Sequence, residues 1–193
     1  MQLDKEFWNQ RWQNGQTGWD IGYASPAIVN YFNKIQDKDI SILIPGCGNA
    51  YEAEALREKG FADITILDIS DEAIARLHKK FQDHDEIKVV CENFFMHKGE
   101  YNFIIEQTFF CALDPNLRKD YAKKMNELLK PNGKLVGLMF DKKFEKAGPP
   151  FGGLREEYIP IFYPYFDFIH FEKTSDSIPQ RMGNEIFIEL QKK

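Results

Sequence analysis

The chain has 193 residues, enough for one substantial hydrophobic core but too few for two ordinary domains. Apolar residues make up 43% of it and charged residues 28%, which excludes a mainly disordered chain. The formal net charge of −5 disfavours a nucleic-acid partner, because a phosphate backbone attracts basic surfaces.

Short apolar runs alternate with segments of helical spacing through the first 140 residues. The predicted strands are residues 40–44, 64–67, 87–91, 101–105 and 134–140. Such alternation is typical of a parallel sheet with crossover helices. Residues 166–172 and 185–190 read as two further strands with no helix between them, so we expect these to pair antiparallel. The predicted fold class is α/β, a mainly parallel sheet that ends in an antiparallel hairpin.

Helix boundaries are marked by local signals. Ser25 precedes Pro26 and combines a capping hydroxyl with a proline in the first helical turn. Asp114 and Pro115 repeat this arrangement before a helix that closes at the Pro-Asn-Gly sequence of residues 131–133. The predicted helices cover residues 51–59, 70–80 and 117–129.

The sequence shows neither a membrane span nor an export signal. No stretch reaches the roughly 18 to 20 apolar residues of a spanning helix, and residues 1–12 are polar and of mixed charge. Cys47, Cys91 and Cys111 are odd in number, widely spaced and set in apolar segments, so we expect buried, reduced thiols. We therefore expect a cytoplasmic protein. The four histidines are scattered, and we expect no metal site.

A glycine-rich turn follows the first predicted strand. Gly46 and Gly48 flank Cys47 immediately before the predicted helix 51–59. Glycines allow positive φ and a close approach of a ligand, and a helix N-terminus presents unpaired N–H groups, so the turn suits a nucleotide-type ligand. The third glycine of the dinucleotide fingerprint is absent, because Tyr51 stands in its place. On its own, the turn leaves a purely structural role open.

An acidic residue ends the second predicted strand. Asp68 lies about 20 residues beyond the glycines, the spacing at which a carboxylate reaches a ribose diol. Each charge-assisted hydrogen bond to a hydroxyl contributes roughly 1.5 to 3 kcal/mol when it is desolvated. The alternative is that Asp68 only caps the helix that follows it.

These two motifs resemble the cofactor motifs of class I S-adenosylmethionine (SAM) methyltransferases. Further blocks narrow the resemblance: FWNQRW at 7–12, TGWD at 17–20, TFFCALDP at 108–115, GPPF at 148–151 and IPQR at 178–181. Together they resemble the thiopurine S-methyltransferase superfamily, most closely its thiol and halide methyltransferase branch, over nearly the whole chain. The resemblance implies a single domain over residues 1–193 with a Rossmann-like, seven-stranded sheet, helices on both faces, and residues 1–24 covering the cofactor.

The resemblance also assigns roles to individual residues. It implies that SAM lies beneath Trp8, Trp12 and Trp19, with Gly46 beside its methionine part and Gly48 in the same turn. Asp68 would bind the ribose, with Ile69 adjacent to it. Asn93 and Phe94 would lie near the adenine, and Gln107 would lie at the amino-acid end. Asn93 departs from the acid that related enzymes often have, but an amide both donates to and accepts from an adenine edge. Glu106 and Gln107 stand where the branch usually has Asp-Tyr.

The tryptophans have a physical reason to face SAM. The cofactor is a sulfonium cation, and the face of a Trp ring attracts a cation by roughly 0.5 to 2 kcal/mol. All the tryptophans of the chain fall within residues 8–19. The alternative is an apolar helix face packed on the core, because Trp8 and Trp12 are four residues apart. A lid helix that packs partly on the fold and partly on the cofactor satisfies both readings.

The acceptor side is predicted to be apolar. Methyl transfer is an in-line displacement in which alignment supplies roughly 7 to 11 kcal/mol. For an anionic acceptor, charge disperses in the transition state, so a dry pocket helps and no general base is essential. Phe110 and Phe140 suit such a pocket, and Phe140 stands where the branch tends to have Tyr. Arg181 is the basic residue expected near the acceptor; its alternative is an exposed side chain in a strand connection.

The sequence thus favours a SAM-dependent methyltransferase acting on a small soft nucleophile: a thiol, bisulfide, thiocyanate, halide or thiopurine. We expect a monomer without a nucleic-acid or membrane partner. Two alternatives stay open. A nicotinamide-dependent oxidoreductase would share the sheet, but Tyr51 and the Trp-rich N-terminus argue against it. A non-catalytic SAM-binding protein is the other, because Asn93, Gln107 and Phe140 depart from the residues that related enzymes usually have.

Overall fold

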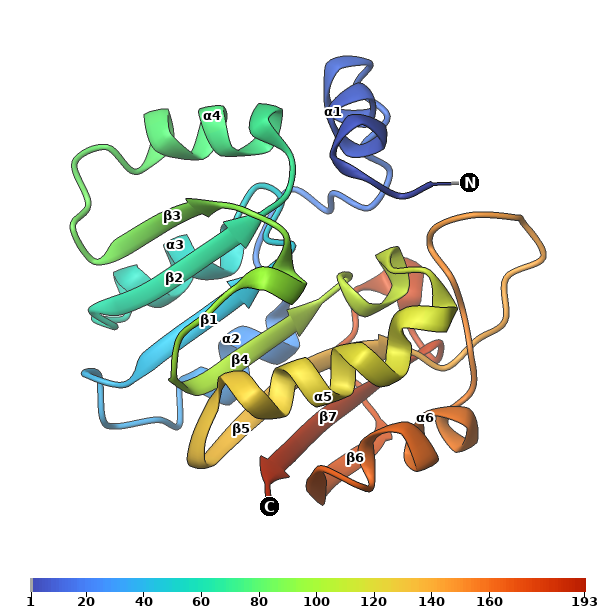
Figure 1. The fold of residues 1–193 in the computed structure, drawn as a ribbon. Coiled ribbons are helices and arrows are strands. Elements are labelled where there is room, and N and C mark those ends of the chain that lie inside the picture. The colour runs from blue at the N-terminus through green and yellow to red at the C-terminus, as the bar shows by residue number, and fades with distance from the viewer. Residues whose placement is uncertain (1) are drawn as a thin grey trace.

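A single seven-stranded sheet runs through the computed structural model, which describes residues 2–193 (Figure 1). Its strand order is β3-β2-β1-β4-β5-β7-β6. The first five strands are parallel to one another, and β7 pairs antiparallel with both β5 and β6. This confirms the predicted fold class. The strands are β1 (Ser41–Pro45), β2 (Asp63–Asp68), β3 (Ile87–Cys91), β4 (Tyr101–Gln107), β5 (Leu129–Phe140), β6 (Phe166–Lys173) and β7 (Glu185–Lys192).

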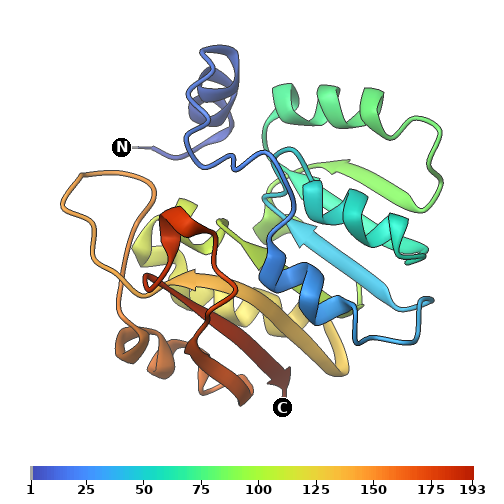
Figure 2. The ribbon, with the colours of Figure 1, turned by 180° about the vertical axis from the view of Figure 1, so that it is seen from behind.

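Helices lie on both faces of the sheet, as Figures 1 and 2 show from opposite sides. The α-helices are α1 (Lys5–Gln13), α2 (Pro26–Phe32), α3 (Tyr51–Glu58), α4 (Asp71–Lys80), α5 (Arg118–Leu128) and α6 (Arg155–Phe162). Four short 3₁₀ turns are η1 (Phe94–Met96), η2 (Phe110–Ala112), η3 (Pro115–Leu117) and η4 (Pro179–Arg181). Within residues 2–193, every helix is too short or too polar to cross a membrane.

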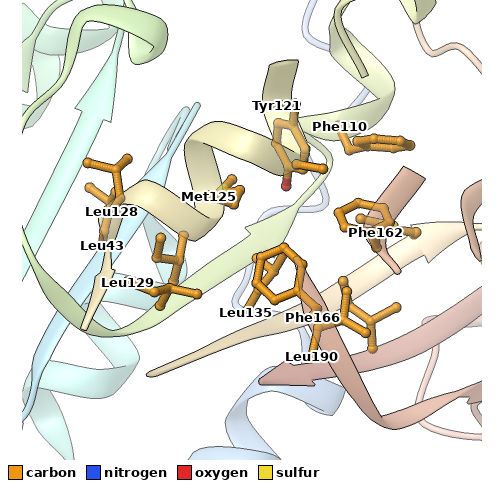
Figure 3. Packing of buried hydrophobic residues seen from close by; sticks show 14 of the residues in the cluster. Leu43, Phe110, Tyr121, Met125, Leu128, Leu129, Leu135, Phe162, Phe166 and Leu190 are labelled. Carbon is orange, nitrogen blue, oxygen red and sulfur yellow. The ribbon is translucent and has the colours of Figure 1, made fainter. Parts of the chain in front are cut away.

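Two hydrophobic clusters hold these helices to the sheet. One packs α2, α3 and α4 against β1 and β2 through residues such as Phe32, Leu56 and Ile64. The other, drawn in Figure 3, packs α5 and α6 against β5, β6 and β7 and includes the fully buried Tyr121 and Phe162. Strand β1 is buried at all five positions, as a central parallel strand covered on both faces should be.

The fold creates a crevice where the strand order reverses. Strand β1 leads on to β2 on one side, and β4 leads on to β5 on the other. The crossovers therefore diverge at the carboxyl ends of β1 and β4, which is where open α/β sheets bind ligands. The glycine turn after β1 and the loop after β4 both lie at this point.

Most predicted elements agree with the structure to within two residues, and the largest strand error is at β5. It begins at Leu129, five residues before the predicted start. Leu129 pairs with Tyr101 and Lys134 pairs with Phe103, so residues 130–133 bulge out between the two pairs. Asn132 adopts a positive φ of 62° within this bulge. The Pro-Asn-Gly signal thus marks a bulge at the start of the strand rather than a boundary before it.

Three local expectations were wrong in detail. Helix α5 begins at Arg118, because Asp114 instead caps the η3 turn by accepting the Asn116 N–H (2.8 Å). Ser25 precedes α2 but makes no side-chain cap; its own N–H donates to Glu52 (2.9 Å). The η4 turn lies between β6 and β7, where no helix was predicted.

The cysteines were only partly as expected. Cys111 is buried and Cys47 is half-buried, but Cys91 is exposed, because it ends the edge strand β3, where no neighbouring strand covers it.

Candidate active site

Hydrogen bonds join the glycine turn to the end of β2. Gly46 and Gly48 adopt positive φ of 59° and 54°. Asp68 accepts the N–H of Gly48 at Oδ2 (3.1 Å) and the N–H of Ser70 at Oδ1 (2.9 Å). The carboxylate is nine-tenths buried, and burial raises its pKa, while these N–H donors lower it. Asp68 therefore fixes the turn, and each oxygen keeps a lone pair for another donor.

A cleft opens beside this turn at the carboxyl ends of β1 and β4. Its volume is about 400 Å³ with its open mouth included. The lining comes from the N-terminal segment, the glycine turn and the end of β4: Trp19, Asp20, Ile21, Tyr23, Gly46, Cys47, Gly48, Asn49, Tyr51, Glu52, Gln107 and Thr108. Backbone from a tight turn and polar side chains therefore face the same space.

The tryptophans form a cluster over the glycine turn. Trp19 meets Trp8 and Trp12 edge to face, with ring centroids 5.6 and 5.7 Å apart. A Cβ atom on Gly48 would lie within 4 Å of both Trp12 and Trp19. Trp12 is only 4% exposed, so it is a packed residue, while Trp19 lines the cleft. The cluster thus combines a structural layer with a ligand-facing one.

Helix α1 is docked on α4 (Figure 1). The Ser70 hydroxyl donates to Asn9 Oδ1 (2.7 Å), so the residue that caps α4 also holds α1. The Arg76 guanidinium lies 5.3 Å from the centroid of the Trp12 ring. The N-terminal segment is therefore attached through polar and cation–π contacts rather than through either hydrophobic cluster.

Asp20 fastens the same segment to the glycine turn. Its Oδ2 atom accepts from Asn49 Nδ2 (2.6 Å) and from the Tyr51 hydroxyl (3.3 Å). Tyr51, which replaces the third fingerprint glycine, thus contributes a hydroxyl to the wall of the cleft.

Gln107 presents an unsatisfied acceptor at the cleft. Its Oε1 atom is buried and has no hydrogen-bond partner among residues 2–193. A buried acceptor without a donor is unfavourable, so the site suits a ligand that supplies an N–H or O–H group. Thr108 follows in the left-handed region, with φ of 59°, which is strained for a β-branched residue.

A smaller and more enclosed cavity shares Thr108 with the cleft. Its walls come from β4, η2, β5, α6 and β7: Glu106, Thr108, Phe110, Cys111, Leu138, Met139, Phe140, Tyr158 and Glu185. It has room for about one water-sized group. Burial raises the pKa of the Cys111 thiol to about 12, so this cysteine is no thiolate at neutral pH.

Glu106 organises the turn between the two spaces. One carboxylate oxygen accepts the N–H groups of Phe109 (2.8 Å) and Phe110 (2.9 Å), and the other accepts the Tyr121 hydroxyl. The pKa of Glu106 is raised to about 7, because the effect of burial is larger than the opposite effect of these three donors. The turn places the Phe109 ring against Gly46, where a Cβ atom would lie 2.3 Å from Phe109 Cδ2. Only glycine fits at that position.

Arg181 joins the N-terminal segment to the cavity wall. Its Nη2 donates to the carbonyl of Trp19 (3.1 Å), and its Nη1 donates to Glu185 Oε1 (3.4 Å). The guanidinium carbon lies 5.4 Å from the centroid of the Phe140 ring. The side chain is 12% exposed, so Arg181 is not the solvated arginine of an ordinary strand connection.

Most of the predicted site residues therefore line one of the two spaces or contact its lining. Trp19, Gly46, Gly48 and Gln107 line the cleft, and Phe110 and Phe140 line the cavity. Trp8, Trp12, Asp68 and Arg181 contact those residues from outside the two spaces.

The remaining predicted residues are not brought to either space. Ile69 is half-buried beside Asp68. Asn93 is exposed and accepts the Phe95 N–H (2.9 Å). Phe94 is buried with its ring 5.2 Å from that of Phe109. No cluster of three or more His, Cys, Asp or Glu side chains within residues 2–193 is placed to hold a metal ion.

Two acidic residues of the cavity went unrecognised from the sequence. Glu106 interrupts the apolar run of β4, and Glu185 is the first residue of the apolar strand β7. A charge inside a buried run is the signal that marks such residues, because buried charges need partners.

Comparisons with known proteins agree with this geometry. The family model of Thiopurine S-methyltransferase (TPMT) matches residues 3–190. "Probable thiol methyltransferase 2" of Arabidopsis thaliana is 32% identical over 184 residues, covering 92% of this chain and 81% of the relative. "Thiocyanate methyltransferase 1" of Brassica oleracea is 30% identical with the same coverage.

Among solved structures, a Burkholderia thailandensis 1,6-didemethyltoxoflavin-N1-methyltransferase with bound 1,6-didemethyltoxoflavin and S-adenosylhomocysteine is similar in fold. Its TM-score is 0.77 at 14% identity, and the match covers 97% of this chain and 86% of that one.

Proposed function

The chain belongs to the thiopurine S-methyltransferase family, and we propose that its cleft holds SAM while the adjoining cavity admits the sulfur acceptor. It is a SAM-dependent S-methyltransferase that acts on small nucleophiles. The observation that supports this division of labour is the meeting of the two spaces at Thr108, which lines both. A donor in one space and an acceptor in the other would meet at that residue.

The residues of the cleft fit SAM. The unsatisfied Gln107 Oε1 is an acceptor for the ammonium group of the methionine part. The Asp68 carboxylate, with its free lone pairs, is assigned to the ribose hydroxyls, and the Trp19 ring to the sulfonium cation. SAM supplies an electrophilic methyl group on a positively charged sulfur. Asn93 and Phe94, in the segment that follows β3, are assigned to the adenine, beyond the lining of the cleft.

The chain's own residues align the acceptor and exclude water. Phe110 and Phe140 wall an enclosed, mostly apolar cavity, in which desolvation favours a soft nucleophile. Glu106 fixes Phe110 by accepting the Phe110 N–H. The Arg181 guanidinium donates to the Trp19 carbonyl and lies over the Phe140 ring, so it links the N-terminal segment to the cavity wall. Both contacts reduce motion between the donor and acceptor sites, and alignment supplies a large part of the rate enhancement.

We extend the proposal to partners and setting. The acceptor is a small molecule, and we propose a monomer that forms no nucleic-acid complex, supported by its net charge of −5. Residues 1–193 are proposed to act as one domain, with residues 1–24 covering the cofactor. A reducing cytoplasm is supported by the free thiols of Cys47, Cys91 and Cys111.

An acceptor panel tests this function. Purified protein with SAM is offered an alkyl thiol, hydrogen sulfide, thiocyanate, iodide and a thiopurine, and S-adenosylhomocysteine formation is measured for each. We expect turnover of at least one sulfur compound. Binding of SAM without turnover of any acceptor would instead indicate a non-catalytic binding protein.

A further inference from the structure

Glu185 lines the cavity with one unsatisfied carboxylate oxygen. The residue is only 2% exposed, and its Oε1 atom accepts from Arg181. Its Oε2 atom is buried and has no hydrogen-bond partner among residues 2–193. The Ser177 hydroxyl, which is likewise buried without a partner of normal geometry, lies beside Glu185 and lowers its pKa. A carboxylate oxygen of a residue that lines the cavity still has a lone pair that can take a proton from a group in that space.

The charges around the cavity oppose an anion. Glu106 of β4 and Glu185 of β7 both line it, whereas Arg181 is already bonded to Glu185 and to the Trp19 carbonyl. The other titratable groups of the lining are the Cys111 thiol of η2 and the Tyr158 hydroxyl of α6. Burial raises the pKa of Cys111 and of Tyr158, so both stay neutral and supply no positive charge. The Arg118 guanidinium of α5 lies behind the Phe110 and Tyr158 rings (4.8 and 5.4 Å) and donates to the Gly152 carbonyl (2.9 Å), so an anion in the cavity would meet the two carboxyl groups of its lining first.

The size and lining of the cavity suit a small sulfur group. The space admits about one water-sized group, which matches the S–H end of a small thiol and is far below the size of a purine. Phe110 and Phe140 present ring surface to it, and polarizable sulfur packs well against aromatic rings.

Resting on the proposed function, we propose that the acceptor enters as a neutral thiol and that Glu185 is the catalytic residue that takes its proton. The new bond joins the acceptor sulfur to the transferred methyl carbon. The bond from that carbon to the sulfonium sulfur breaks, and its electron pair stays on the departing S-adenosylhomocysteine. The S–H proton passes to Glu185 Oε2. The positive charge of the sulfonium and the negative charge of the carboxylate both disappear, so the step creates no net charge in a dry cavity.

The surroundings of Glu185 suit this role. Burial raises its pKa above the ordinary carboxyl range, while Arg181 and Ser177 oppose that rise. A carboxylate whose pKa is raised is a better base than an ordinary one, provided that it is ionised at the working pH. Thiol methylation should therefore fall as the pH drops and Glu185 becomes protonated.

The test compares two soft acceptors that differ in their proton. At pH 7, 2-mercaptoethanol is mostly neutral and carries an S–H group, because thiols ionise well above that pH, whereas thiocyanate is a permanent anion. In Glu185→Gln, kcat for the thiol should fall about 10²- to 10⁴-fold, the usual contribution of a general base, while kcat for thiocyanate should change less than about threefold. Glu185→Asp keeps the carboxylate and should recover at least part of the thiol rate.

Equilibrium binding gives a readout that is independent of turnover. Titration of the protein alone with thiocyanate should show weaker binding to the wild type than to Glu185→Gln, because the substitution removes a negative charge from the cavity. The matched control is Glu189→Gln, on the same strand but paired with Lys134 (2.6 Å) outside the cavity, and it should leave both readouts unchanged.

Contrary outcomes separate the two proposals. Two results in a folded Glu185→Gln variant would overturn the role of Glu185. One is an equal fall in kcat for the thiol and for thiocyanate. The other is thiol turnover within threefold of the wild type. If the wild type methylates thiocyanate but not the thiol, the proposed function stands and the role of Glu185 falls. If it methylates no acceptor at all, both fall.

Discussion

The cleft and the cavity lie side by side but are built by different means. The cleft is lined by three segments at the ends of elements: the N-terminal stretch with Trp19 and Asp20, the turn at Gly46 and Gly48, and the end of β4. The cavity is made by side chains from five separate elements and is held by the buried carboxyl of Glu106. Under the proposed assignment, loops that carry the sequence motifs would hold the cofactor, and side chains brought together by tertiary packing would hold the acceptor.

The two spaces also differ in how their polar groups are satisfied. At the cleft, the hydrogen-bond partners of Asp68 are backbone N–H groups, those of Gly48 and Ser70. At the cavity, Glu106 depends on Tyr121 of α5, and Glu185 depends on Arg181. Changes at the cavity should therefore alter the stability of the whole fold, whereas changes at the cleft should mainly alter cofactor affinity.

The largest effect is expected for Glu106→Ala. The substitution leaves the N–H groups of Phe109 and Phe110 and the Tyr121 hydroxyl without their acceptor, and each buried orphan costs roughly 1 to 3 kcal/mol. The free energy of unfolding, measured with a chemical denaturant at pH 4.5, where the ionisation of Glu106 costs little, should fall by about 3 kcal/mol or more. Glu127→Ala, at an exposed position on α5, should change it by less than about 0.5 kcal/mol. A loss below about 1 kcal/mol for Glu106→Ala would show that the cavity does not depend on this network.

The pH dependence of the unfolding free energy tests the burial of Glu106 separately. The pKa of Glu106 is raised from 4.5 to about 7 by burial, so the native state holds a proton that the unfolded chain releases between these values. Below pH 4.5 both states are protonated and there is no penalty; as the pH rises to 7, this residue destabilises the fold by about 3 kcal/mol. Glu106→Gln should lack the effect. Its unfolding free energy relative to the wild type should therefore rise by about that amount from pH 4.5 to pH 7, and a flat difference would contradict the shift.

At the cleft, Asp68→Ala should weaken SAM binding roughly ten- to a hundredfold, from the loss of two charge-assisted hydrogen bonds. Calorimetric titration measures this directly. Asp68→Asn keeps an acceptor but removes the charge, so its affinity for SAM should lie between those of Asp68→Ala and the wild type. Asp63→Ala, at the opposite end of β2, is the matched control and should bind SAM normally. Unchanged affinity in Asp68→Ala would refute the ribose assignment and leave Asp68 as a support of the turn.

The smallest effect is expected for Trp19→Ala. Loss of a cation–π contact of roughly 0.5 to 2 kcal/mol corresponds to a 2- to 30-fold weaker affinity for SAM. Tyr163→Ala removes an exposed aromatic ring at the end of α6, which is not part of the cleft lining, and should have no effect. Wild-type affinity in Trp19→Ala would mean that the tryptophan cluster only attaches the N-terminal segment.

The comparison also explains what the sequence could and could not predict. The strands and the glycine turn follow from local composition, so their prediction needed no knowledge of distant contacts. No range was predicted for helix α6, because Pro160 lies inside it and masks the helical pattern. The bulge in β5 was taken for a boundary, because a Pro-Asn-Gly turn signal does not reveal that Tyr101 pairs with Leu129 beyond it.

The site divides in the same way. Gly46, Gly48 and Trp19 could be placed at the cleft because the motifs are contiguous with it. Glu185 could not be placed at the cavity, because only the antiparallel pairing of β7 with β5 brings it opposite Phe140. The role of Asn93 at the adenine stays a prediction; its side chain is exposed and lines neither space.

The most direct test of the account is a calorimetric titration of the wild-type protein with SAM, S-adenosylhomocysteine and NADH. It requires no knowledge of the acceptor and addresses the cleft alone. We predict micromolar or tighter binding of both SAM and S-adenosylhomocysteine, and no binding of NADH. Failure of both sulfur nucleosides to bind, or binding of NADH in their place, would contradict the assignment of the cleft and, with it, the methyltransferase mechanism.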